Sequence, residues 1–256
     1  MFAQRLPEYN NSITAHLKRL KWHSNAALAQ PNFEIRVPYD KIALIIDGVF
    51  HAVAKPSISM GDLQLALWNG YYHAHGFLHL VVWGPDGMAV FDFYDIGSNN
   101  DVSLTHNSDF VHYMGMHAPE FFALGDSIFP NLECLVRVPN ANDMEHLGIS
   151  KGEMEDYANV RSLGEHGFKM LWDKGNLLGN MKQMKVFWTK PLRYVRAALI
   201  MINIVSIFSG NQTVERFKQN PPSLRHYLQR KPDVVVDEDV QVFLGINVEL
   251  EEGEDE

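Results

Sequence analysis

The sequence is almost free of cysteine, because Cys134 is the only one among its 256 residues. A lone cysteine cannot form a disulfide within the chain, which favours a reducing, intracellular compartment over secretion. It also lacks a neighbouring Cys-His arrangement, so we expect Cys134 to be a small core residue.

Long apolar runs are missing as well. The N-terminus has no apolar stretch of signal-peptide length. The most apolar run, Ala197 to Phe208, is interrupted by Asn203 and Ser206 and is shorter than the roughly 20 residues that a membrane span needs. We therefore expect a soluble protein with no membrane partner.

Nucleotide-binding signatures of the Gly-x-x-x-x-Gly-Lys-Ser/Thr or Gly-x-Gly-x-x-Gly kind are absent too, and no clear basic nuclear-import run is visible.

Basic residues are missing from the C-terminal end of the chain. From Asp233 to Glu256 there are ten acidic residues and no basic one, whereas the rest of the chain has 21 acidic residues against 22 Lys and Arg. The net charge of −9 therefore belongs to this tail. Such a like-charge segment is expected to stay solvated and disordered. It acts either as a solubilising tail or as an autoinhibitory mimic of nucleic acid that covers a basic groove.

What the chain does contain is enough apolar sequence for one sizeable α/β domain, since 46% of it is hydrophobic and 11% aromatic. Several strands precede any long helix. The last helix is apolar nearly all round and is expected to be buried. From periodicity and turn residues we expect strands over residues 42–47, 50–54, 71–83, 88–94 and 121–125, and helices over 10–29, 101–113, 153–171 and 192–208.

Three carboxylates stand in well-marked positions. Asp47 and Asp126 each end an apolar run next to a glycine, and Glu165 lies in a helical stretch. A buried strand that stops at such a residue places a carboxylate at the rim of a sheet, where ligands bind. Mg²⁺ takes oxygen ligands and keeps some of its waters, so two or three carboxylates from different elements can hold it. Taken singly, each acid also has an ordinary explanation: Asp47 as a turn residue and Glu165 as an ion-pair partner of Arg161 four residues earlier.

A series of further motifs occurs in a fixed order over most of the chain. These are Ile46-Asp47-Gly48 with Lys55-Pro56-Ser57; Asn69-Gly70, His75-Gly76 and Pro85-Asp86-Gly87-Met88; Gly97 to Asp101 with Ser108; Gly125 to Pro130; Val160-Arg161 with Glu165 to Phe168; and Lys182 to Tyr227 with Gly210 to Thr213 and Pro221-Pro222. In this order the motifs resemble those of the DDE superfamily endonucleases, the catalytic domain of PIF/Harbinger-type transposases.

The resemblance implies an α/β fold of the RNase H-like kind, a mixed sheet flanked by helices. It also implies that Asp47, Asp126 and Glu165 are catalytic and bind divalent metal, Mg²⁺ or Mn²⁺. Asp101 belongs to a family motif too, but an Asp at a helix start is an ordinary N-cap, so a cap or supporting role competes with direct ligation. The partners implied are DNA and a separate Myb-like DNA-binding protein or a second copy of the chain, and the compartment implied is the nucleus.

Some positions differ from the family pattern. Val49, Tyr72 and His73 replace a threonine and basic residues, and Gly164 and Gly167 flank Glu165 where larger apolar residues are usual. Each glycine inside a helix costs about 1 kcal/mol relative to alanine, which is expected to weaken the helix that carries the third acid.

Histidines form another candidate group. His73, His75 and His79 share one side of the strand expected over residues 71–83, since alternate residues face the same way. They are either zinc ligands or half-exposed strand residues beside a DNA groove, and no acid or cysteine nearby completes a ligand set.

Two functions follow from the sequence. One is a metal-dependent endonuclease or transposase domain that cleaves or transfers DNA phosphodiesters, with basic residues along the DNA backbone. The other is a domesticated or decayed transposase that keeps the fold as a non-catalytic DNA- or protein-binding module. For both functions, we expect residues 1–40 to form an N-terminal helix and connector, residues 41–232 the endonuclease domain and residues 233–256 the acidic tail. The basic residues expected to contact DNA are Lys169, Lys174, Lys182, Lys185 and Arg193.

Overall fold

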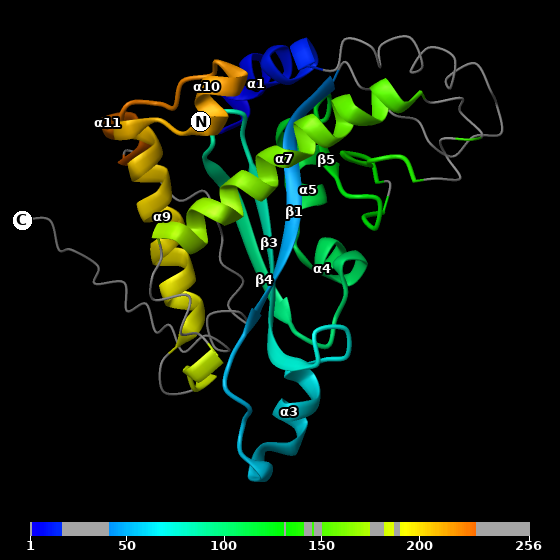
Figure 1. The fold of residues 1–256 in the computed structure, drawn as a ribbon, viewed down its shortest axis with the longest axis vertical. Helices are drawn as coiled ribbons and strands as arrows, with labels where there is room; N and C mark the ends of the chain where they lie inside the picture. The colour runs from blue at the N-terminus through cyan, green and yellow to red at the C-terminus, as the bar shows by residue number, and fades with distance from the viewer. Residues whose placement is uncertain are drawn as a thin grey trace, which may run out of the picture.

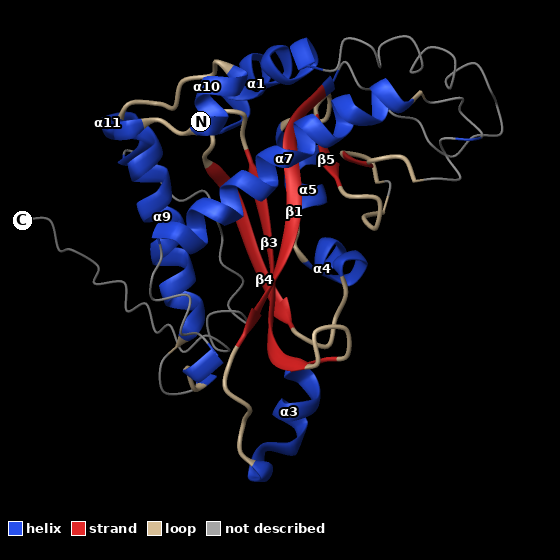
Figure 2. Ribbon diagram, in the orientation of Figure 1, coloured by secondary structure: helices blue, strands red, loops and turns tan. Residues whose placement is uncertain are grey.

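A mixed sheet with helices on both faces forms the centre of the molecule (Figures 1 and 2), which confirms the α/β class. This computed structural model describes residues 2–16, 41–130, 132–140, 145, 150–174, 182–186 and 190–228. The acidic tail, residues 17–29 of the predicted N-terminal helix and the connector up to residue 40 therefore lie outside the described residues. The strands are β1 (Ile42–Ala52), β2 (Trp68–Asn69), β3 (Ala74–Trp83), β4 (Ala89–Ile96), β5 (Phe122–Gly125) and β6 (Leu135–Arg137).

The sheet is antiparallel on one side of β1 and parallel on the other. β3 pairs antiparallel with both β1 and β4, while β5 pairs parallel with β1 and with β6. The long strands therefore follow the order β4-β3-β1-β5-β6, and the short β2 pairs with the start of β3. β1 is central because Ile42 to Ile46 form a continuous apolar run, at most 1% exposed, that only an inner strand can bury on both faces.

Two apolar clusters lie on the two faces of the sheet. On β1, Ile45 and Val49 face one cluster, and Ile46 and Phe50 face the other, as the alternation of a strand requires. The first face is covered by α7 (Lys151–Lys174) and α9 (Pro191–Ser209), and α7 crosses β1 in Figure 1. The second is covered mainly by α1 (Phe2–His16), α4 (Asp101–Asn107) and α5 (Phe110–His117).

A buried carboxylate fastens α1 to the turn between β3 and β4. Asp86 is fully buried and forms an ion pair with Arg5. Its Oδ2 accepts a hydrogen bond from the Tyr9 hydroxyl at 2.6 Å, and its Oδ1 accepts one from the Met88 N–H at 3.2 Å. Burial raises the pKa of Asp86, although the nearby Arg5 charge opposes that rise. The Pro85-Asp86-Gly87 turn thus has a structural partner 81 residues earlier in the chain.

Helix α7 is continuous through Gly164 and Gly167, so their cost in helix propensity does not break the helix. A Cβ on Gly167 would lie 2.6 Å from the indole ring of Trp83, and one on Gly164 would lie 3.1 Å from Cβ and Oδ2 of Asp47. Both glycines are buried where α7 crosses the sheet. Their missing side chains allow the helix to approach β1 and β3 closely.

Replacing Gly167 with alanine is expected to destabilise the protein by about 1–3 kcal/mol, because the gain in helix propensity is smaller than the overpacking against a fully buried Trp83. Urea unfolding measured by far-UV circular dichroism would give this value. Gly115 of α5 is the matched control, since nothing lies within 4 Å of a Cβ there and Gly115→Ala should be neutral or stabilising. Equal effects of the two substitutions would contradict the packing role of Gly167.

Several predicted elements differ from the observed ones. β1 is one strand through Asp47 and Gly48, not two. The helix expected over 101–113 is broken at Asp109, which has a left-handed φ of 52° and separates α4 from α5. α1 begins at Phe2, ahead of residue 10. Among the described residues, four helices and two strands were not predicted: η2 (Ile58–Met60), α3 (Gly61–Leu67), α10 (Gln212–Phe217), α11 (Leu224–Leu228), β2 and β6.

The expectation that the last helix is buried is wrong. α9 buries Val195, Leu199 and Ile202, but Met201 and Phe208 are 59% and 70% exposed. By length and composition α9 is the one helix in the described residues that could cross a membrane. Its buried Asn203 is bound to β4 instead, donating to the Ala89 carbonyl at 2.8 Å and accepting from the Ala89 N–H at 2.9 Å.

Candidate acidic site

The fold brings the three sequence-predicted acids to one region beside the centre of β1. Asp47 lies in the middle of that strand and its Oδ1 accepts a hydrogen bond from the Gly48 N–H at 2.9 Å. Asp126 directly follows β5, the parallel neighbour of β1. Glu165 lies on α7 next to Gly164, the residue that would touch Asp47 if it carried a Cβ. Three elements far apart in the chain therefore meet at this point.

Arg161 connects two of these acids. Its Nη2 donates to Glu165 Oε1 at 2.6 Å, which bears out the i, i+4 ion pair expected from the sequence. Its Nη1 also donates to Asp126 Oδ2 at 3.4 Å, a contact that the sequence did not indicate. The guanidinium lies between the two carboxylates and neutralises part of their charge.

Asp47 is the electrostatically strained member of the site. Burial raises the pKa of Asp47 to about 6. The Gly48 N–H and the charge of Arg161 lower it, while the charges of Asp126 and Glu165 raise it. These influences show that the other three side chains lie within electrostatic reach of Asp47. A carboxyl group poised near neutral pH in an acid-lined site is typical of functional positions.

Asp101 approaches the same region from the opposite face of the sheet. The N-cap of α4 is Asn100, whose side chain accepts from the Ser103 N–H at 2.9 Å, so the expectation that Asp101 is the cap is wrong. A Cβ on Gly48 would lie 2.9 Å from Asp101 Oδ1. Glycine after Asp47 therefore leaves room for a fourth carboxylate. Burial, followed by the charge of Asp126, raises the pKa of Asp101.

The donor set consists of carboxylates on separate elements, which is what a hard cation such as Mg²⁺ or Mn²⁺ prefers. Among the described residues, however, no three His, Cys, Asp or Glu side chains converge closely enough to hold one ion. Instead, Arg161 lies between Asp126 and Glu165 and pairs with both. A cation bound by both acids would have to replace the guanidinium.

The three histidines singled out in the sequence are not brought together. His73 lies in a turn with a left-handed φ of 48°, His75 is half-buried at the start of β3, and His79 is fully buried. The prediction that His79 is a half-exposed strand residue is therefore wrong. Its Nδ1 lies 3.0 Å from Nε2 of the equally buried His51, a partner that alternation along β1 could have indicated. Burial lowers the pKa of His51 to about 4 and that of His79 well below its ordinary value, so the pair is neutral at physiological pH.

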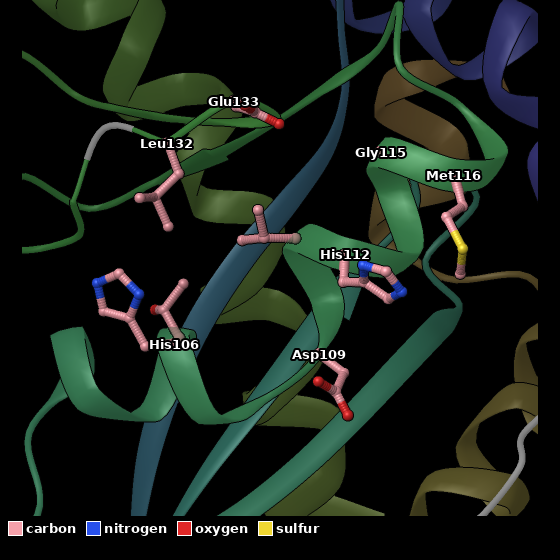
Figure 3. A pocket seen from close by; sticks show the side chains of 9 residues that line it. His106, Asp109, His112, Gly115, Met116, Leu132 and Glu133 are labelled. Atoms are coloured by element: carbon pink, nitrogen blue, oxygen red, sulfur yellow. The ribbon is translucent and has the colours of Figure 1, made fainter.

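A cavity of about 490 Å³ lies between α4, α5 and the turn before β6, and none of the four acids lines it. Figure 3 shows His106 and His112 on different parts of its wall, with Asp109 below them. These side chains do not form a ligand cluster. Cys134 is buried nearby, as expected for a core residue, and burial raises the pKa of its thiol to about 11, which makes it unreactive.

Comparison of the chain with family models, curated proteins and solved structures found no match. The geometry of the acidic site therefore has to support any functional assignment by itself.

Proposed function

We propose that this protein is a divalent-metal-binding endonuclease or transposase-derived domain acting on DNA phosphodiesters. The observation that carries the proposal is the meeting of Asp47, Asp126 and Glu165 from β1, the end of β5 and α7 around a carboxyl group whose pKa is raised to about 6. The strand order β4-β3-β1-β5-β6, antiparallel up to β1 and parallel beyond it, supports an RNase H-like fold. With this function, DNA is the bound polymer and the nucleus is the compartment, with a Myb-like protein or a second copy as partner.

Each residue of the site has a distinct task in this proposal. Asp47, Asp126 and Glu165 would hold the cation once it has replaced the Arg161 guanidinium, and Asp101 would support Asp126 from the other face of the sheet. A bound Mg²⁺ or Mn²⁺ would supply Lewis-acid stabilisation of charge on the attacking and leaving oxygens of the phosphodiester. Arg161 holds Asp126 and Glu165 in place before the cation binds, because its guanidinium offsets their mutual repulsion.

Titration with Mn²⁺ by isothermal calorimetry tests the proposal. The wild-type protein is expected to bind Mn²⁺ and to nick supercoiled plasmid DNA in its presence. Asp126→Asn should weaken binding at least about tenfold and abolish nicking, because it removes a ligand charge. Asp62→Asn on α3 is the matched control, since Asp62 is an exposed aspartate outside the site, and it should match wild type. Absence of both binding and nicking in the wild type would contradict the enzymatic function.

A second function, a transposase-derived module that binds without cleaving, is favoured by one specific observation. Arg161 already pairs with two of the three acids, so the site is internally neutralised without a metal. Arg161→Ala separates the two functions. An enzyme whose cation replaces the guanidinium should keep or gain Mn²⁺ affinity in this variant. A non-catalytic module should be destabilised, because Asp126 and Glu165 lose their ion-pair partner, and it should bind no ion.

A further inference from the structure

Three large aromatic side chains are exposed within five residues, at the end of the sheet that carries α3 (Figure 1). They belong to a hairpin formed by residues 68–75, here named the aromatic hairpin, in which Trp68 pairs with His75 across β2 and β3. Tyr71 is 86% exposed, Tyr72 50% and Trp68 40%. Large rings left in water at this density mark a binding surface rather than a core.

The aromatic hairpin is held rigidly. The Asn69 side chain donates to the Gly97 carbonyl at 2.7 Å and accepts from the N–H groups of Tyr71 and Tyr72 at 2.9 and 3.1 Å. Tyr72 stacks flat on Phe50, with ring centroids 4.6 Å apart and planes 4° apart, and Tyr71 meets Tyr72 edge-on at 4.9 Å. These contacts order the backbone of the hairpin and the Tyr72 ring before a ligand binds, which reduces the conformational entropy lost on binding.

The aromatic hairpin lies within electrostatic reach of the acidic site. Phe50, on which Tyr72 stacks, lies on the same face of β1 as Gly48, the glycine that faces Asp101. The pKa of the Tyr72 phenol is raised by burial and then by the charge of Asp101, with smaller contributions from Tyr71 and Asp47. The exposed Lys55 lies within electrostatic reach of His75, whose ring lies 5.1 Å from that of Trp68. A cation suited to phosphate therefore lies near the aromatic hairpin.

We propose that the aromatic hairpin binds unpaired nucleotides of DNA, with bases stacked on Trp68 and Tyr71 and a backbone phosphate near Lys55. This inference rests on the proposed function, which supplies DNA as the polymer. Stacking on exposed aromatic rings beside a basic group is the common mode of single-strand binding, because every base offers a flat face. Ile58 and Leu65, which are 91% and 74% exposed on the preceding segment, extend the surface but offer no ring for a base. The exposed flat faces of Trp68 and Tyr71, with Lys55 nearby, favour nucleotides as the ligand.

Fluorescence polarisation with a labelled single strand of about 12 nucleotides tests the inference. The full chain is used in EDTA, so that the result does not depend on metal binding or cleavage. Trp68→Ala and Tyr71→Ala are each expected to weaken single-strand affinity about fivefold to a hundredfold, while Tyr71→Phe retains it. Phe208→Ala, which removes a 70% exposed ring from α9, is the matched control and should bind as wild type does. Because Tyr71 is 86% exposed, its truncation should leave the unfolding transition unchanged.

Single-strand binding that depends on both rings and exceeds binding of the matching duplex supports the inference, even if the protein binds no Mn²⁺ and the proposed catalysis fails. Equal affinity of wild type, Trp68→Ala and Tyr71→Ala overturns it, even if Mn²⁺ binds at the acids. A loss of self-association in the two variants, measured by sedimentation velocity without a loss of DNA affinity, would also overturn it and would assign the surface to a second copy of the chain.

Discussion

Asp47→Asn is expected to stabilise the metal-free protein at pH 8 by up to about 3 kcal/mol and to abolish its stabilisation by Mn²⁺. The substitution keeps the shape of the side chain but removes a charge that the folded state disfavours. Burial raises the pKa of Asp47 from 3.8 to about 6, so ionisation at pH 8 weakens folding. If Asp47 served only to stabilise the fold, Asp47→Asn would destabilise the protein.

The direction of this pKa shift determines how the stability of the protein depends on pH. Because the folded-state pKa lies above the unfolded one, the contribution of Asp47 to stability is fully present below pH 3.8 and is lost as the pH rises to about 6. The difference between wild type and Asp47→Asn should therefore be near zero at pH 3.5 and should reach its full value above pH 6.5. Urea unfolding at a series of pH values measures it.

The affinity for Mn²⁺ should change over the same pH range as the stability does. Mn²⁺ binds the ionised carboxylate, so wild-type affinity is expected to fall as the pH drops through about 6, the pKa of Asp47. Asp62→Asn is again the control and should leave both profiles unchanged. If Asp47→Asn destabilises the protein at pH 8, or leaves Mn²⁺ binding intact, Asp47 is a structural residue and the proposed site is wrong.

Asp86→Ala is expected to be the most destabilising single substitution considered, at about 3–5 kcal/mol. It removes the carboxylate that pairs with Arg5 and accepts from Tyr9 and the Met88 N–H, and so leaves buried donors without their acceptor. Helix α1 would lose its polar contacts with the turn between β3 and β4. Thermal and urea unfolding of the full chain would measure the loss, with Mn²⁺ affinity as a separate readout.

A double-mutant cycle controls this result. Arg5→Ala alone should also destabilise the protein, because it leaves the fully buried Asp86 charge uncompensated. The double variant should lose less stability than the sum of the two single variants, since each single change already breaks the ion pair. Additive losses, or an Asp86→Ala variant within about 0.5 kcal/mol of wild type, would show that the ion pair does not fasten α1.

The fold was predictable where local pattern and tertiary environment agree. The run from Ile42 to Ile46 gave the central strand, and the periodic residues of α7 gave the longest helix. The break at Asp109 was missed because it depends on one backbone conformation in an otherwise helical pattern. The exposure of α9 was missed because hydrophobicity does not reveal which faces of a helix have neighbours.

For the site, the sequence by itself determined which carboxylates are available and that each ends or lies on a regular element. The spacing of residues along the sequence cannot predict which side chains make contact, because contacts between distant elements depend on how strands pair and how closely helices pack. Only the tertiary structure decided that Gly164 makes room for Asp47, that Gly48 makes room for Asp101, and that Arg161 joins Asp126 to Glu165. It also decided that Asp47 is the acid whose charge the fold disfavours, since burial is a property of the packed chain.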